Sequence, residues 1–72
     1  MPKLVPLKPR EVEKILLANG FKLNVSKSSH RQYYSTSTKA HTTVPFHSKD
    51  LPLGTLRSII RQSQLSIDIF RK

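Results

Sequence analysis

The chain contains no cysteine and no tryptophan, and only four acidic residues and two glycines among its 72 residues. Without cysteine it can form neither a disulfide nor a thiolate metal site, and it is compatible with a reducing compartment. No apolar run approaches the roughly 20 residues that span a bilayer, and the N-terminal end lacks the long apolar stretch of a signal peptide. We therefore expect a cytoplasmic protein with no membrane partner.

The shortage of carboxylates also limits the chemistry that the chain can perform. The whole supply consists of Glu11, Glu13, Asp50 and Asp68. Metal-dependent nucleases usually need several convergent carboxylates, and these four are scattered along the chain. The three histidines, His30, His41 and His47, have no spacing typical of a local zinc motif. We expect no metal site and no small-molecule cofactor.

Positive charge is what the chain has in abundance. Thirteen lysines and arginines face the four acidic residues, which gives a formal net charge of +9. Such an excess on so small a surface attracts polyanions. Nucleic acid is the first candidate partner, and an acidic protein is the second. A membrane surface is disfavoured because the basic residues are spread along the chain and do not form one amphipathic basic helix.

The chain is short enough that we expect one domain over residues 1–72, with residues 1–8 as an extended basic lead-in. Pro9 suits the first position of a helix, and Gly20 suits the left-handed residue just past its end. These two signals predict a helix over residues 9–19. Its buried stripe is formed by Val12, Ile15 and Leu16.

Three strands are expected next. Alternating apolar and polar residues predict a half-buried strand over residues 21–25, followed by a turn at 26–29. Residues that suit pleated surfaces predict a second strand at 30–34 and a third at 41–47. Short connections make neighbouring strands antiparallel. The apolar positions of the first strand are Phe21, Leu23 and Val25.

A second helix is expected to begin near Pro52, with a buried stripe of Leu56, Ile59 and Ile60. Ser66 is typical of an N-cap for a last short turn that buries Ile67, Ile69 and Phe70. The order is therefore α-β-β-β-α. We expect an α+β fold in which a three-stranded antiparallel sheet has both helices packed on one face.

Two histidines stand at the ends of predicted strands: His30 begins the second strand and His47 ends the third. Imidazole takes and gives protons near neutral pH, and RNA carries its own nucleophile, the 2′-hydroxyl. Two histidines and a few cations would therefore be enough for metal-free cleavage of RNA. Taken alone, the residues leave open that His30 is merely a polar strand residue and that His47 is structural.

The predicted strand pairing decides whether these histidines meet. If Tyr34 pairs with His41, His30 lies opposite Pro45 and diagonal to His47. A shift by two residues would place the two histidines directly opposite each other. Neighbours on one face lie roughly 5 Å apart when opposite and 7–8 Å apart when diagonal. In either register both histidines share the outer face of the sheet.

Four short motifs occur in order: Gly20-Phe21, the run SSH at 28–30, the run TVPFH at 43–47, and the run GTLR at 54–57. In order and spacing they resemble the HicA family of small toxins, the RNA-cleaving partners of HicB antitoxins, from about residue 9 to residue 70. The resemblance implies a fold of the double-stranded-RNA-binding-domain type and a catalytic histidine at His30. Two departures are Ser28 and Gln64, which stand where the family commonly has glycine.

The resemblance implies a toxin-type endoribonuclease that cleaves mRNA without a metal and is paired with a HicB-type antitoxin. His30 would act as general base or acid, and His47 is the candidate for the second acid–base group. Lys27 and Arg31, the basic residues nearest in sequence, would hold phosphates, and Tyr34 would stack on a base or bond a phosphate. The alternatives are a non-catalytic RNA-binding module of the same fold and an interaction domain for an acidic protein.

Overall fold

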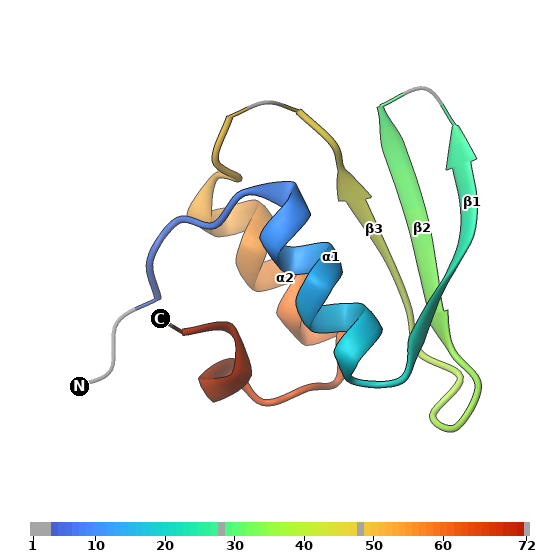
Figure 1. Ribbon diagram of the computed structural model, residues 1–72. Coiled ribbons are helices and arrows are strands. Elements are labelled where there is room, and N and C mark those ends of the chain that lie inside the picture. Colours follow the sequence, from blue (N-terminus) through green and yellow to red (C-terminus); the bar gives the residue numbers. More distant parts are fainter. Residues whose placement is uncertain (1–3, 28, 48, 72) are drawn as a thin grey trace.

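The computed structural model describes residues 4–27, 29–47 and 49–71, and the side chains of residues 25–27 lie outside that description. Helices α1 (Pro9–Ala18) and α2 (Leu53–Ser63) lie on one side of a three-stranded sheet (Figure 1). The sheet is antiparallel in the order β1-β2-β3, formed by β1 (Phe21–Lys27), β2 (His30–Ser35) and β3 (His41–Pro45). The predicted α-β-β-β-α order and α+β fold class are confirmed.

The strand boundaries differ from the predicted ones. β1 continues to Lys27, two residues into the segment expected as a turn, and β3 ends at Pro45, two residues early. The ends of a strand depend on which residues of the neighbouring strand pair with it, and a pattern within one segment does not reveal these partners. Lys27 pairs with His30, so the connection between β1 and β2 is shorter than the turn predicted over residues 26–29.

Helix α1 begins at Pro9, as predicted, and its start is capped by an acidic residue. The backbone N–H of Lys8 donates to Glu11 Oε1 at 2.9 Å. This bond satisfies a backbone donor just outside the helix, as in one half of a capping box. At the other end Gly20 has φ +89°, the left-handed conformation that glycine adopts without steric cost.

The core lies between the helices and the sheet. The predicted helix residues Val12, Leu16, Leu56, Ile59 and Ile60 are all buried there. Tyr33 and Val44 face them from the sheet, and Phe70 closes the core from the C-terminal turn. Full burial of each large apolar side chain stabilises the fold by about 1.5–3 kcal/mol.

Two buried leucines lie outside the predicted helices and strands, one in the predicted lead-in and the other between the third strand and the second helix. Leu7 is 1% exposed and Leu51 is 2% exposed. The backbone N–H of Leu51 donates to the carbonyl of Leu7 at 2.8 Å, so the two segments pair just before each helix begins. Neither residue belongs to a periodic pattern, which is why sequence patterning did not identify them as core.

Three apolar residues predicted to be buried are largely exposed: Leu23 at 43%, Ile67 at 45% and Ile69 at 38%. Leu23 lies on the edge strand β1, where coverage by the helices ends. A β-bulge follows Leu23, as the shift in pairing register between Leu23 and Val25 shows. The 3-10 turn η1 (Ile67–Phe70), capped by Ser66 as predicted, buries only Phe70.

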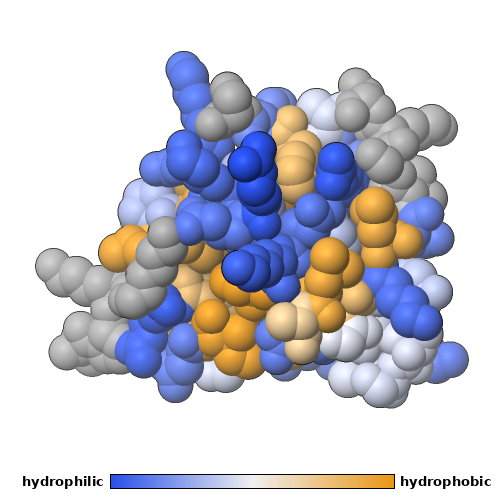
Figure 2. All heavy atoms as spheres, in the orientation of Figure 1, coloured by the Kyte–Doolittle hydropathy of each residue, from blue (hydrophilic) through white to orange (hydrophobic). Residues whose placement is uncertain are grey.

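The exposed apolar residues contribute to an uneven surface. Figure 2 shows hydrophilic side chains over the upper part of the face that carries α1, and apolar side chains gathered in the lower part. Among the described residues, no helix is long and apolar enough to cross a membrane.

Candidate active site on the outer face of the sheet

The face of the sheet turned away from the helices is polar. Along β2, His30 and Gln32 are exposed while Tyr33 is buried, and along β3, Thr43 is exposed while Val44 is buried. This alternation is the two-residue period of a strand with one face in water. It confirms that His30 faces outward.

The observed register brings the two strand-end histidines together. Tyr34 pairs with His41 and His30 pairs with Pro45, which is the first of the two registers considered above. The backbone N–H of Phe46 also donates to the carbonyl of Ser29, so the pairing continues past the end of β3. The centroids of the His30 and His47 rings are 6.4 Å apart, with the rings nearly perpendicular at 81°.

A second ring pair occupies the opposite end of the same two strands. Tyr34 and His41 are stacked, with centroids 6.3 Å apart and an interplanar angle of 26°. Tyr34 is half-buried and His41 is exposed. The outer face therefore carries imidazole at one end and a stacked aromatic platform at the other, joined by the polar residues Gln32 and Thr43.

Arg31, predicted to hold phosphate, points toward the helices. Its Nη1 donates to Glu13 Oε2 of α1 at 2.8 Å, and its guanidinium lies 4.1 Å from the centroid of the Phe46 ring. The hydrogen bond to Glu13 raises the pKa of Arg31 above its usual range. Its charge is already paired with Glu13, and its guanidinium lies over the Phe46 ring. Closeness to His30 in the sequence is therefore a weak guide to the role of Arg31.

Glu13 also accepts a hydrogen bond from the hydroxyl of Tyr33, at 2.5 Å. Tyr33 is fully buried, and this burial, reinforced by the bond to Glu13, raises the pKa of its hydroxyl above its usual range. One carboxylate of α1 thus binds two inward-facing side chains of β2, Arg31 and Tyr33, which lie one and three residues after His30. No local sequence pattern indicates this link, because it joins residues about 20 positions apart.

Lys27, the other predicted phosphate ligand, is placed only by its backbone. It ends β1 and pairs with His30 across the turn. Its side chain lies outside the described residues, as does all of Ser28 of the SSH run. The roles of Lys27, Arg31 and Tyr34 in RNA binding remain predictions.

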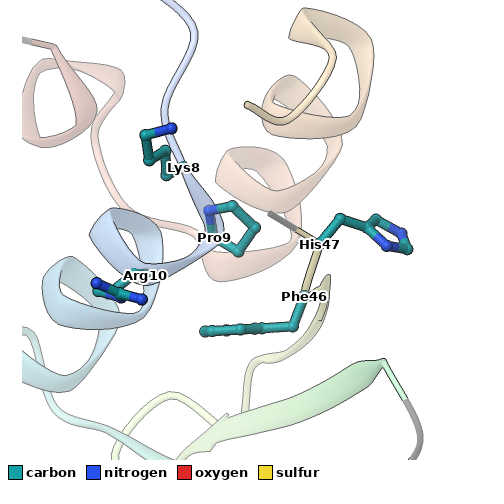
Figure 3. A pocket seen from close by; sticks show the side chains of 5 residues that line it. All are labelled: Lys8, Pro9, Arg10, Phe46 and His47. Carbon is teal, nitrogen blue, oxygen red and sulfur yellow. The ribbon is translucent and has the colours of Figure 1, made fainter. Parts of the chain in front are cut away.

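A cavity of about 300 Å³ opens beside His47, between the start of α1 and the end of β3. Figure 3 shows the Phe46 ring extending beneath Pro9 and Arg10, with the imidazole of His47 turned away at the rim. Lys8 completes the lining. No sequence pattern links Lys8 and Arg10 to His47, because they lie far from it along the chain. Only the packing of α1 against β3 brings them together.

Three of the four carboxylates form ion pairs with different basic residues. Glu13 pairs with Arg31, Asp50 with Lys8 at 3.7 Å, and Asp68 with Arg71 at 2.8 Å. Within the part of the chain that the structure describes, no three His, Asp or Glu side chains converge as metal ligands would. The outer face offers imidazoles and hydroxyls, which suit proton transfer and hydrogen bonding to an anion.

A family comparison agrees with this reading of the fold and of the motifs. A sequence model of the family described as "HicA toxin of bacterial toxin-antitoxin" matches residues 9–65. The chain belongs to the HicA toxin family. The matched range runs from the first residue of α1 past the end of α2 and includes both histidines of the pair.

Membership makes the protein the toxin of a toxin–antitoxin system, with a cognate antitoxin as its partner. A comparison with curated protein sequences gave no match.

Proposed function

We propose that this HicA toxin is a metal-independent endoribonuclease that cleaves mRNA in the cytoplasm, with His30 as a catalytic residue and His47 as the second acid–base group. The observation that carries the proposal is the His30–His47 pair, 6.4 Å apart on the exposed sheet face of a HicA toxin. An imidazole must come within about 2.6–3.2 Å of the oxygen that it serves. One phosphodiester group is therefore large enough to engage both rings.

The proposed reaction uses the RNA's own hydroxyl. One imidazole takes the proton of the 2′-OH, the 2′-oxygen bonds to phosphorus, and the bond from phosphorus to the 5′-oxygen breaks. The other imidazole, initially protonated, gives its proton to the departing 5′-oxygen. The products are a 2′,3′-cyclic phosphate and a 5′-hydroxyl. His30 is base or acid, and His47 takes the complementary role.

Neighbouring residues would hold the RNA. Tyr34 lies on the same face as His30 and offers a ring for stacking or a hydroxyl for a phosphate. Lys27 ends β1 directly opposite His30, and on this backbone position we propose it as a ligand of the same phosphate chain. Arg31 would have to exchange Glu13 for phosphate, so we expect it to contribute less than Lys27.

The test is cleavage of a single-stranded RNA, alone, with excess EDTA, and with one 2′-hydroxyl at the cleavage point replaced by hydrogen. The proposal predicts unchanged cleavage in EDTA, no cleavage at the deoxy position, and a cyclic phosphate end. Activity that is lost on chelation and restored by magnesium would contradict the mechanism. Cleavage at the deoxy position would contradict it as well.

The alternative is a non-catalytic RNA-binding module on the same fold. The net charge of +9 and the Tyr34–His41 platform favour RNA binding whether or not cleavage follows. Tight RNA binding with no cleavage by freshly purified protein would select this alternative. For either function we propose a HicB-type antitoxin as the partner, and an acidic antitoxin surface would complement the same charge.

A further inference from the structure

The cavity beside His47 combines two features that single-stranded nucleic acid uses. Its lining contains the flat ring of Phe46 beside the buried Pro9, and its rim carries the cations of Lys8 and Arg10 (Figure 3). Its volume of about 300 Å³ is at the lower end of the range typical of ligand-binding sites in proteins. Proteins that bind single strands pair aromatic stacking surfaces with cations that follow the backbone.

The cations at the rim are available to a ligand. Arg10 is exposed, and no carboxylate of the described residues pairs with it. Lys8 lies 3.7 Å from Asp50, but both side chains are more than half exposed, so the pair is weak and readily exchanged. The backbone N–H of Lys8 is occupied by Glu11, so attraction for an anion comes from the two side chains.

The Phe46 ring is held in position from the side of the sheet. The guanidinium of Arg31 lies 4.1 Å from its centroid, and Glu13 in turn fixes Arg31. Phe46 is half-buried against the core, so the ring is both anchored and accessible from the cavity. A held ring loses little conformational freedom when a base stacks on it.

We propose that this cavity seats the nucleotide of single-stranded RNA that adjoins the cleaved phosphodiester on the His47 side. The base stacks on Phe46 beside Pro9, and the next phosphate lies near Arg10 and Lys8. The inference rests on the proposed function, because His47 both lines the cavity and forms the candidate catalytic pair with His30. An acidic protein segment would satisfy the cations but would make no use of the stacking surface.

The test measures binding of a short single-stranded RNA whose 2′-hydroxyls are methylated, so that it cannot be cleaved. Fluorescence anisotropy at one fixed salt concentration compares Arg10→Gln with Arg61→Gln, an exposed arginine on α2 outside the cavity. It also compares Phe46→Leu with Phe70→Leu, a core phenylalanine outside the cavity. The phenylalanine pair controls for the packing that each protein loses when a ring is removed, and thermal unfolding measures this loss directly.

We expect Phe46→Leu to weaken binding about tenfold, because aromatic stacking is worth about 5- to 160-fold per base. Arg10→Gln should weaken binding severalfold more than Arg61→Gln, while Phe70→Leu should lower thermal stability with little effect on binding. Cavity variants that bind no more weakly than their controls would overturn the proposal.

A base-specific measurement separates stacking from charge. Replacing one base at a time by an abasic residue should weaken binding to the wild type at one position and leave binding to Phe46→Leu unchanged there. If Phe46→Leu does not fold, the ring resonances of Phe46 in the wild-type protein provide the readout. They should shift on adding the methylated RNA, and unshifted resonances with bound RNA would contradict the proposal.

None of these measurements depends on cleavage, so failure of the two proposals can be told apart. A protein that binds the RNA through the cavity and cleaves nothing would contradict the proposed function only. A protein that cleaves RNA with no dependence of binding on Phe46 or on the abasic position would contradict the cavity inference only.

Discussion

At the scale of single residues, Glu13 determines the geometry of the inner side of the site. Its Oε2 accepts from both Tyr33 and Arg31, and Arg31 supports the ring of Phe46, the neighbour of His47. The outer face carries the candidate chemistry, and the residue that precedes its second histidine is held from the interior. Substitutions in this network should therefore change stability first and the placement of His47 second.

Tyr33→Phe tests this network through pH. Because the pKa of Tyr33 is raised on folding, its contribution to stability is complete below the unfolded pKa of about 10 and is lost as pH rises through the folded value. At neutral pH the variant should lose about 1.5–3 kcal/mol of unfolding free energy, the worth of a hydrogen bond to a charged group. Denaturant unfolding at several pH values measures both effects.

The deficit of Tyr33→Phe relative to the wild type should shrink as pH rises above about 10. Tyr34→Phe is the matched control, since Tyr34 is half-buried and makes no hydrogen bond through its hydroxyl among the described residues. A deficit that stays constant up to strongly alkaline pH would show that ionisation of Tyr33 is not coupled to folding.

His47→Ala tests whether the second histidine takes part in proton transfer. With one imidazole as acid and the other as base, the cleavage rate should be bell-shaped in pH. The variant should be slower by about 10²–10⁴-fold and should lose one limb of the bell. A full bell at a merely reduced rate would indicate that His47 is structural and that another group donates or accepts the proton.

At the scale of elements, sequence reasoning succeeded where a periodic face or a local cap determines the structure. The stripe of α2, the helix start at Pro9 and the cap at Ser66 are confirmed for this reason. Sequence patterns did not predict that Leu7 and Leu51 are buried or that Leu23 is exposed, because their exposure depends on which other segments pack against them. The pairing of His30 with Pro45 was one of two registers that the sequence allowed, and cross-strand contacts chose between them.

The same limit applies to the candidate site. The outward orientation of His30 follows from strand alternation, and its closeness to His47 follows once the register is known. The sequence does not predict the bond between Glu13 and Arg31 or the cavity beside His47, because α1 is distant from both strands along the chain. Helix packing against the sheet is a tertiary property that no local pattern encodes.

Gln64→Gly is the prediction at this scale. Gln64 ends α2 with φ +62°, a left-handed conformation that suits glycine far better than glutamine. The substitution should raise the unfolding free energy by up to about 1 kcal/mol, less the greater freedom that glycine gives the unfolded chain. Thermal unfolding measures the effect. Glycine at the neighbouring helical position, in Ser63→Gly, should destabilise, and a loss of stability in Gln64→Gly itself would contradict the assignment.

At the scale of the whole molecule, the charge of +9 governs encounters with RNA. The logarithm of the RNA affinity should fall linearly with the logarithm of salt concentration. For single-stranded RNA the slope is about −0.7 per phosphate neutralised. Titrations at several salt concentrations measure it. An affinity that does not change with salt would contradict electrostatic RNA binding and favour a protein as the main partner of the basic surface.

The central claim is that His30 performs acid–base chemistry on RNA, and its most direct test is the cleavage rate of His30→Ala. Gln32→Ala is the matched control, since Gln32 is the next exposed residue on the same face of β2. The account predicts that His30→Ala cleaves RNA at least about 10²-fold more slowly, with unchanged circular dichroism and thermal stability, while Gln32→Ala stays close to the wild type. Equal cleavage by His30→Ala and the wild type, at matched folding, would contradict it.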